Sequence, residues 1–139
     1  MNLSLKTTRS DMARSVMEGL AYNNRWTKEA AEKFIRRPIR SFRFSGGGAL
    51  SDLWAQIHAD VLKTPIHQVD DPVHATLRGV ALLGFISLGV LGLEDIPKLV
   101  KIKKVFDPQE DHFSVYDKMY VQYRRLFSQN RKIFRALNQ

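Results

Sequence analysis

The chain has 139 residues, which is enough for one domain and rarely enough for two. Its apolar fraction of 44% and charged fraction of 26% are those of a soluble globular protein, which excludes disorder over the whole chain. The absence of cysteine excludes disulfides, thiolate metal sites and a cysteine nucleophile, and it fits a reducing compartment such as the cytoplasm. The net charge is +8, but the basic residues are spread over several segments without an RNA-binding or helix-turn-helix motif, which argues against nucleic acid as a partner.

The first predicted element is a long amphipathic helix. Before it, residues 1–10 hold no apolar run of the length that a secretory signal needs. Thr8 and Asp11 are spaced as in a capping box, where the hydroxyl accepts a first-turn amide and the carboxylate suits the positive end of the helix dipole. Apolar or small residues then recur at helical spacing, so the helix should run to about Phe34 and end before Pro38.

A strand, a glycine turn and a second helix should follow. Residues 39–44 alternate around two phenylalanines and favour a strand. The three glycines that come next do not suit a strand interior. Residues 50–61 place apolar side chains on one helical face, and this helix should end at Pro65. A short strand over residues 66–69 is expected after the proline.

A third helix is expected to begin at Asp71 as its cap, with Pro72 at the first helical position, where a missing amide costs nothing. Residues 77–88 are apolar nearly all round, which predicts a buried helix. The most apolar stretch, residues 79–93, is fifteen residues long and contains four glycines. A membrane span needs about 20 apolar residues, so this stretch predicts a buried helix with its following turn and no membrane partner.

The residues after the third helix are predicted to form a loop and a final helix. Residues 91–111 hold two prolines and a basic run, which favours a loop with at most one short helical turn. The whole order is that of an α/β layer arrangement. Two strands make a poor sheet, so the sheet should continue in residues outside this chain or in a partner. Residues 114–137 should form the last helix, with an aromatic stripe typical of a packing face: Tyr116, Met119, Tyr120, Tyr123, Phe127 and Phe134.

The glycine turn at residues 46–49 is the feature that carries chemistry. Glycine lets backbone amides approach a ligand closely, and the start of a helix adds unpaired N–H groups, so the turn suits a phosphate or the edge of a nucleotide. Neither the Walker spacing nor the dinucleotide-binding spacing is present. By itself, the pattern is equally compatible with a tight structural turn.

The surroundings of the turn resemble a known family. Residues 44–51, followed by Trp54, Gln56 and Ala59-Asp60, resemble the pattern GGGAxSxxWxQxxAD of the FGGY carbohydrate kinases. Other segments resemble the family in the same order: residues 14–22 (RAVLEGVAF), Pro65-Ile66 (the pV strand), residues 75–83 (ALGAALLA), and Phe106, Pro108, Tyr116, Tyr120 and Tyr123 (the tail of the xylulokinase-like branch).

The resemblance implies a fold and a ligand. FGGY kinases have two lobes of the actin and ribonuclease H-like type with ATP between them. Residues 1–139 would be a single domain, the C-terminal portion of the ATP-binding lobe, helix-rich with a short incomplete sheet. The turn would lie against the adenosine of ATP or ADP. The residues implied to face the nucleotide are Gly46, Gly47, Gly48, Ala49 and Ser51, with Leu50 lining the adenine pocket.

Several matched positions also have structural interpretations. Ser51 is equally expected as a plain helix cap. Gln56 and Asp60 lie a turn or more beyond the glycines and are expected to hold the fold through polar contacts. Arg78 departs from the family pattern, which has glycine there. Its side chain should either point to solvent or enter what would be a close helix contact.

The catalytic parts of the family are not assigned to this chain. The aspartate general base, the phosphate-cradling loops and the carboxylates that hold Mg²⁺ lie before the matched region in the family. No catalytic residue and no metal ligand is therefore predicted here. The pairs Asp70-Asp71 and Glu94-Asp95 are expected as caps or solvated turns. The histidines lack metal-ligand spacing and are expected to be structural or exposed: His58, His67, His74 and His112.

Three interpretations of function remain open. The first is an ATP-binding-lobe fragment of a kinase for a pentulose or a related sugar or polyol, inactive alone, whose partner is the missing N-terminal kinase portion or a second copy in a homo-oligomer. The second is a non-enzymatic interaction or regulatory domain that keeps the lobe fold. The third is a basic nucleic-acid binder, which a salt-dependent shift on DNA would favour. A preceding or neighbouring sequence that encodes the kinase N-terminal part would separate the first from the second.

Overall fold

The computed structural model describes residues 3–138. Residues 1, 2 and 139 lie outside it. The domain expected over residues 1–139 is therefore described from residue 3 to residue 138, and the expectation for residues 1–10 from residue 3. Short 3-10 helices occupy Gly47–Leu50 (η1), Pro72–His74 (η2), Leu93–Asp95 (η3) and Glu110–His112 (η4). The helices and strands are α1 (Arg9–Ile35), β1 (Phe42–Phe44), α2 (Asp52–Leu62), β2 (Ile66–Val69), α3 (Ala75–Ser87), α4 (Ile96–Leu99), β3 (Ile102–Phe106) and α5 (Phe113–Leu137).

The start and end of α1 confirm the sequence prediction. Thr8 Oγ1 accepts from the Asp11 N–H at 3.2 Å, and Asp11 Oδ2 accepts from the Thr8 N–H at 2.9 Å, which completes a capping box. The hydrogen bonds from Thr8 lower the pKa of the Asp11 carboxyl. The helix ends at Ile35, followed by Arg36 in the left-handed region with φ of 56°, two residues before Pro38.

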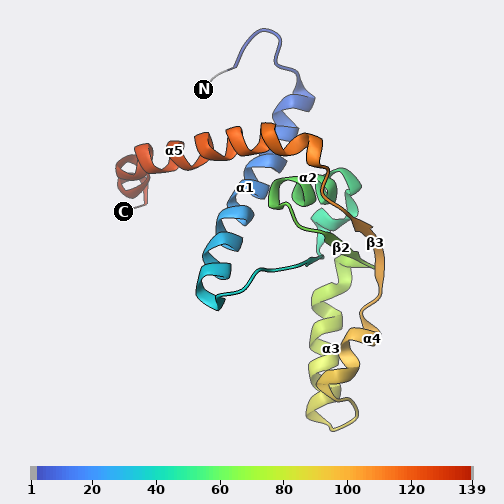
Figure 1. The fold of residues 1–139 in the computed structure, drawn as a ribbon. Helices are drawn as coiled ribbons and strands as arrows, with labels where there is room; N and C mark the ends of the chain where they lie inside the picture. Colours follow the sequence, from blue (N-terminus) through green and yellow to red (C-terminus); the bar gives the residue numbers. More distant parts are fainter. Residues whose placement is uncertain (1–2, 139) are drawn as a thin grey trace.

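The sheet has three strands in the order β1-β2-β3, with β1 parallel and β3 antiparallel to β2 (Figure 1). Ile66 of β2 lies opposite Phe42 on one side and Phe106 on the other. The expectation of a loop with one short helical turn over residues 91–111 was therefore wrong in one respect: the segment contains the short helix α4, but it also contains the strand β3. The sequence did not predict this strand because only Phe106 of its five residues is buried, which leaves no alternating apolar pattern.

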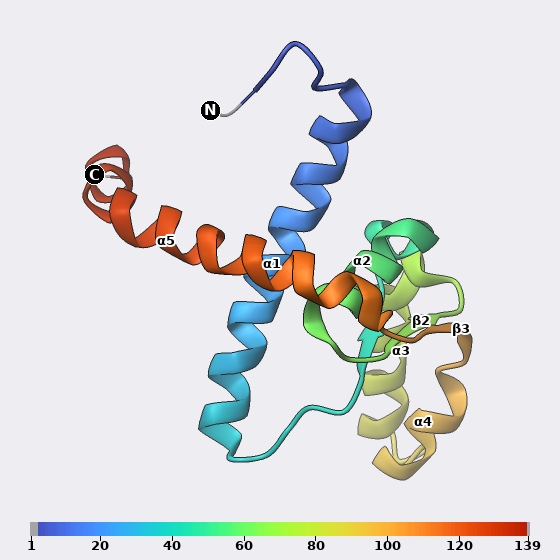
Figure 2. The same cartoon turned by 45° about the horizontal axis from the view of Figure 1, so that its top comes forward.

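The main core lies where α1 and α2 meet the first half of α5. Figure 2 shows α5 crossing α1 near the middle of α1. Tyr22 of α1 packs against Tyr116 and Tyr120, which are buried, and its ring centroid lies 5.6 Å from that of Tyr123. Trp26 meets the edge of Phe127 at 5.2 Å between ring centroids. The predicted packing role is thus confirmed for Tyr116, Tyr120, Tyr123 and Phe127, whereas Met119 is 50% exposed.

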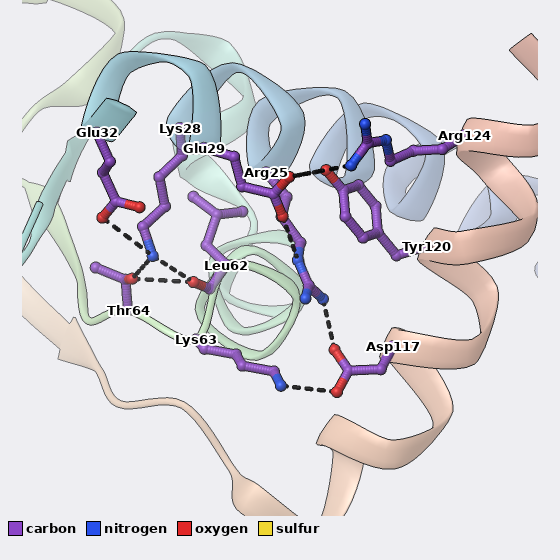
Figure 3. A network of polar contacts seen from close by, with 10 residues as sticks. All are labelled: Arg25, Lys28, Glu29, Glu32, Leu62, Lys63, Thr64, Asp117, Tyr120 and Arg124. Carbon is purple, nitrogen blue, oxygen red and sulfur yellow. Dashed lines mark hydrogen bonds and ion pairs between the residues drawn. The ribbon is translucent and has the colours of Figure 1, made fainter. Parts of the chain in front are cut away.

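Charged groups around this core bind α5 to α1 and to the end of α2 (Figure 3). Asp117 lies 2.8 Å from both Lys63 Nζ and Arg25 Nη1, and these hydrogen bonds, chiefly that from Lys63, lower the pKa of its carboxyl. The Tyr120 hydroxyl donates to Glu29 Oε2 at 2.8 Å. Burial, with the neighbouring Glu29, raises the pKa of Tyr120 to about 12, so its phenol stays a hydrogen-bond donor at neutral pH.

A second polar cluster holds the chain just before α5. Asp60 of α2 is 2% exposed and accepts three hydrogen bonds. They come from the Gln109 N–H at 2.9 Å, from Gln56 Nε2 at 2.8 Å, and from His112 Nδ1 at 2.7 Å. The prediction that Gln56 and Asp60 hold the fold through polar contacts is confirmed.

The prediction that residues 77–88 are buried was wrong. No residue of α3 is buried, and Leu77, Val80 and Leu83 are each more than 60% exposed. Figure 1 shows α3 and α4 extending away from the other helices. An apolar surface all round a helix indicates that it has neighbours but not which chain supplies them. Within residues 3–138, nothing covers this face of α3.

The entry into α3 also differs from expectation. Pro72 does occupy the first position of a helical turn, but that turn is η2, and Asp71 makes no side-chain cap to its backbone. Asp71 instead places Oδ1 2.8 Å from His74 Nδ1. Arg78 turns back onto this connection and donates to the carbonyl oxygens of Asp70 and Asp71 at 3.0 and 3.1 Å. It therefore tethers the connection, and it does not enter a close helix contact.

Candidate functional site

The glycine turn lies between β1 and α2 and passes through η1. Gly46 has φ of 85° and ψ of −178°, a backbone region that is essentially restricted to glycine. Its N–H donates to the carbonyl oxygen of Pro72 at 2.7 Å. Gly46 therefore fixes the turn against the connection between β2 and α3.

The next two glycines have different surroundings. A Cβ atom on Gly48 would lie 2.7 Å from the indole of Trp54, so a side chain there would displace the ring. A Cβ atom on Gly47 would have no heavy atom within 4 Å, and the φ of Gly47 is not positive. Gly48 is thus required for packing, whereas the backbone of Gly47 borders open space.

The end of the turn separates buried from accessible groups. Ala49 is fully buried, and its carbonyl oxygen accepts from Gln68 Nε2 at 2.6 Å. Ser51 caps α2, since its Oγ accepts the backbone N–H three residues on at 3.2 Å. Leu50 is 64% exposed. The most exposed groups of this turn are therefore the backbone at Gly47 and the side chain of Leu50, while Gly46, Gly48 and Ser51 are partly exposed.

Gln68 of β2 holds the turn in place through its side-chain amide, a role that the sequence did not predict. This side chain is 1% exposed, and its amide also lies 3.2 Å from Asp52 Oδ1. Asp52 in turn pairs with Lys104 Nζ of β3 at 2.8 Å. Hydrogen bonds from Lys104 and then Gln68 lower the pKa of the Asp52 carboxyl. The only sequence signal was a glutamine inside a short strand that begins with Ile66 and ends with Val69.

A hollow of about 380 Å³ lies beside the turn, between the end of β1, α3 and α4. Ser45, which directly precedes Gly46, lines this hollow, whereas Leu50 does not. The lining is apolar apart from two arginines and one serine: Arg43, Ser45, Val69, Ala75, Arg78, Gly79, Leu82, Leu83, Ile96 and Val100.

The histidine with the most contacts, His58, is structural. It is 4% exposed, and burial lowers its pKa, which keeps the ring neutral near pH 7. Nδ1 lies 2.8 Å from the carbonyl oxygen of Trp54 and donates to it, which leaves Nε2 to accept from Asn24 at 3.0 Å. Within residues 3–138, no three His, Asp or Glu side chains are grouped as metal ligands would be. None of the helices in the same range is both long and apolar enough to span a bilayer.

Residues 1–88 match the family model described as "FGGY family of carbohydrate kinases, C-terminal domain". The chain belongs to this family. The match includes the glycine turn and all of α2 and α3, so the FGGY resemblance of these segments is confirmed.

Individual relatives agree with the family model. The chain is 26% identical over 138 residues to a xylulose kinase of Staphylococcus epidermidis, covering 96% of this chain and 27% of that protein. It is 28% identical over 111 residues to a glycerol kinase of Natranaerobius thermophilus, covering 80% of this chain and 22% of that protein. The FGGY chain thus spans about a quarter of the length of the relatives it matches.

Solved structures confirm the fold class. The crystal structure of xylulose kinase from Rhodospirillum rubrum superposes with a TM-score of 0.79 at 27% identity, covering 97% of this chain and 28% of that one. The expected fold, a helix-rich α/β part of an actin-like and ribonuclease H-like lobe with a short sheet, is therefore correct. The chain is a sugar-kinase C-terminal domain by family.

Proposed function

We propose that this chain supplies part of the ATP-binding lobe of a carbohydrate kinase, with adenosine contacts at residues 46–51. The observation that carries the proposal is the family match over residues 1–88, because it spans the turn and the helix that follows it. The accessible backbone at Gly47 and the exposed Leu50 support it, since a nucleoside needs close backbone approach and an apolar neighbour. Mg²⁺ and the sugar would be held by residues outside this chain.

The proposed partner is the remainder of the kinase. β1 is an edge strand, paired only with β2 within the described sheet, so its outer edge can accept another strand. The exposed apolar side chains of α3, among them Leu77, Val80 and Leu83, form a surface of the kind that proteins cover with a partner. Both features lie within residues 1–88. The proposed substrate class of the assembled kinase is a pentulose or a related sugar or polyol, after the names of the relatives.

The nucleotide site is tested by chemical-shift mapping with ADP on the isotope-labelled chain. We expect shifts clustered on residues 46–51, with a dissociation constant on the order of millimolar because the phosphates and Mg²⁺ lack most of their partners. Adenosine should shift the same residues, and inorganic phosphate should not. Shifts confined to the basic residues 98–104 would contradict the proposal, because the phosphates would then bind by charge alone.

Catalysis is tested on the purified chain by itself. We expect no ATP-dependent phosphorylation of xylulose, ribulose or glycerol above a buffer control, because we place the general base and the sugar contacts in the other three quarters of the kinase. A full-length relative serves as the positive control in the same coupled assay. Turnover by the isolated chain would contradict this division of roles.

An interaction or regulatory domain is the second candidate, favoured by the same exposed α3 face. Mixing the chain with a separately produced N-terminal kinase portion separates the two candidates. Recovered sugar phosphorylation supports the lobe function, whereas binding to that portion without recovered activity supports a regulatory role.

A further inference from the structure

The glycine turn is anchored at two points by residues that follow it in the chain. Gln68 Nε2 of β2 donates to the carbonyl oxygen of Ala49 at 2.6 Å, and the Gly46 N–H donates to the carbonyl oxygen of Pro72 at 2.7 Å. The two anchors differ in what holds them. Gln68 lies within β2, where a strand on each side fixes its backbone. Pro72 lies in the connection between β2 and α3, so the rigidity of the Gly46 anchor depends on that connection.

The connection contains a residue in a strained backbone conformation. Asp71 has φ of 45° and ψ of 64°, which lies in the left-handed region that favours glycine. Such a residue keeps its conformation only where the surrounding structure holds it. The side chains of Asp71 and His74 contact each other, but both are more than half exposed, and an exposed pair adds little stability. The backbone of Asp71 therefore depends on its other contacts.

Arg78 supplies such contacts from the first turn of α3. Helical side chains lean toward the amino end of their helix, which directs Arg78 back over the connection. Its Nη2 donates to the carbonyl oxygens of Asp70 at 3.0 Å and Asp71 at 3.1 Å, and lies 3.7 Å from Asp71 Oδ2. The helix dipole opposes a cation at this end of a helix, so these acceptors are what stabilise the guanidinium here. The Arg78 side chain also lines the hollow beside the turn together with Ser45, the residue before Gly46.

We propose that Arg78 is a positioning residue for the nucleotide turn, acting through the Pro72 carbonyl group that anchors Gly46. By holding two successive carbonyl oxygens, Arg78 keeps the next residue, Pro72, where the Gly46 N–H meets it. Without these bonds the connection relaxes at Asp71, the Gly46 anchor opens, and the turn becomes mobile. A ligand that binds a mobile turn must order it, and that cost lowers the affinity. The inference rests on the proposed adenosine contacts at residues 46–51.

Hydrogen exchange and ADP titration of substituted chains test the inference. Arg78→Met keeps an unbranched side chain but removes every donor. We expect it to speed the exchange of the Gly46 N–H by at least about tenfold through local opening, and to weaken ADP binding by about fivefold. Arg78→Lys keeps N–H donors near the same carbonyl oxygens, so both quantities should stay within about twofold of those of the unsubstituted chain.

Asp117→Ala is the matched control for a general loss of stability. It removes the ion pairs with Lys63 and Arg25, which hold α5 and do not touch the connection. It should leave the ADP affinity unchanged, and it should speed the exchange of the Gly46 N–H no more than that of the α2 amides. Circular dichroism verifies that each variant keeps its helices.

Three results would each overturn the role of Arg78. The first is ADP affinity or Gly46 exchange that is unchanged in Arg78→Met. The second is an equal loss in Arg78→Lys, because donors near these carbonyl oxygens would then not restore the anchor. The third is an equal loss in Asp117→Ala, which would show a general effect of stability. The proposed function fails differently, by the absence of ADP shifts at residues 46–51 in the unsubstituted chain, and the Gly46 exchange rates then still decide whether Arg78 holds the turn.

Discussion

Asp60→Ala is expected to destabilise the protein by about 3 kcal/mol. Asp60 is 2% exposed and is the common acceptor for Gln109, Gln56 and His112. Removing the carboxylate takes away three hydrogen bonds to a buried charged acceptor, and one hydrogen bond to a charged group contributes about 1.5–3 kcal/mol. The exposed Gln109 and His112 regain water, and Gln56 Nε2 keeps the Asp107 carbonyl oxygen at 2.9 Å, so the expected loss is that of one to two such bonds. Urea denaturation followed by circular dichroism measures the change.

Two further substitutions distinguish this mechanism from a general loss of negative charge. Asp60→Asn keeps one carbonyl oxygen for the Gln109 N–H, so it should cost roughly half as much as alanine. Asp107→Ala removes an exposed carboxylate from the same connection and should change the stability by less than about 0.5 kcal/mol. Equal losses for Asp60→Ala and Asp107→Ala would show that net charge, and not the buried cluster, controls the stability.

Gly47→Val should weaken ADP binding by at least about tenfold, a free-energy change of about 1.4 kcal/mol or more, without unfolding the chain. Gly47 has an ordinary backbone conformation and open space where a side chain would extend, so valine fits the fold. Its branched side chain would then occupy the surface where we propose that adenosine approaches the backbone. Chemical-shift titration with ADP measures binding, and thermal unfolding verifies the fold.

The neighbouring glycines are the controls for this substitution. Gly46→Val forces a left-handed backbone on a branched residue, and Gly48→Val places a side chain against the Trp54 ring. Both should lower the stability by about 1–3 kcal/mol whether or not the protein binds a nucleotide. If Gly47→Val binds ADP as tightly as the unsubstituted chain does, the nucleotide does not approach the turn from this side.

Local physical rules in the sequence were sufficient for much of the scaffold. The capping box at Thr8 and Asp11 and the proline after α1 set the limits of that helix, because caps and prolines act within one turn of chain. The aromatic face of α5 likewise followed from periodicity, and the strand at Ile66–Val69 was expected from its place after Pro65. The family likeness of the glycine turn was visible in the residues themselves and is confirmed by the family match.

Only the tertiary structure showed which groups of the turn are accessible. The sequence contains three adjacent glycines, but Gly46 is needed for its backbone angle, Gly48 for the Trp54 ring, and Gly47 for neither. Gln68 of β2 donates to the carbonyl oxygen of Ala49, and Lys104 of β3 pairs with Asp52 at the start of α2. Both are far from the turn in sequence, and β3 has no apolar alternation that would predict it. The sequence also did not predict that α3 is exposed. An apolar pattern indicates that other residues cover a helix, but which residues cover it depends on the segments that the fold brings beside it.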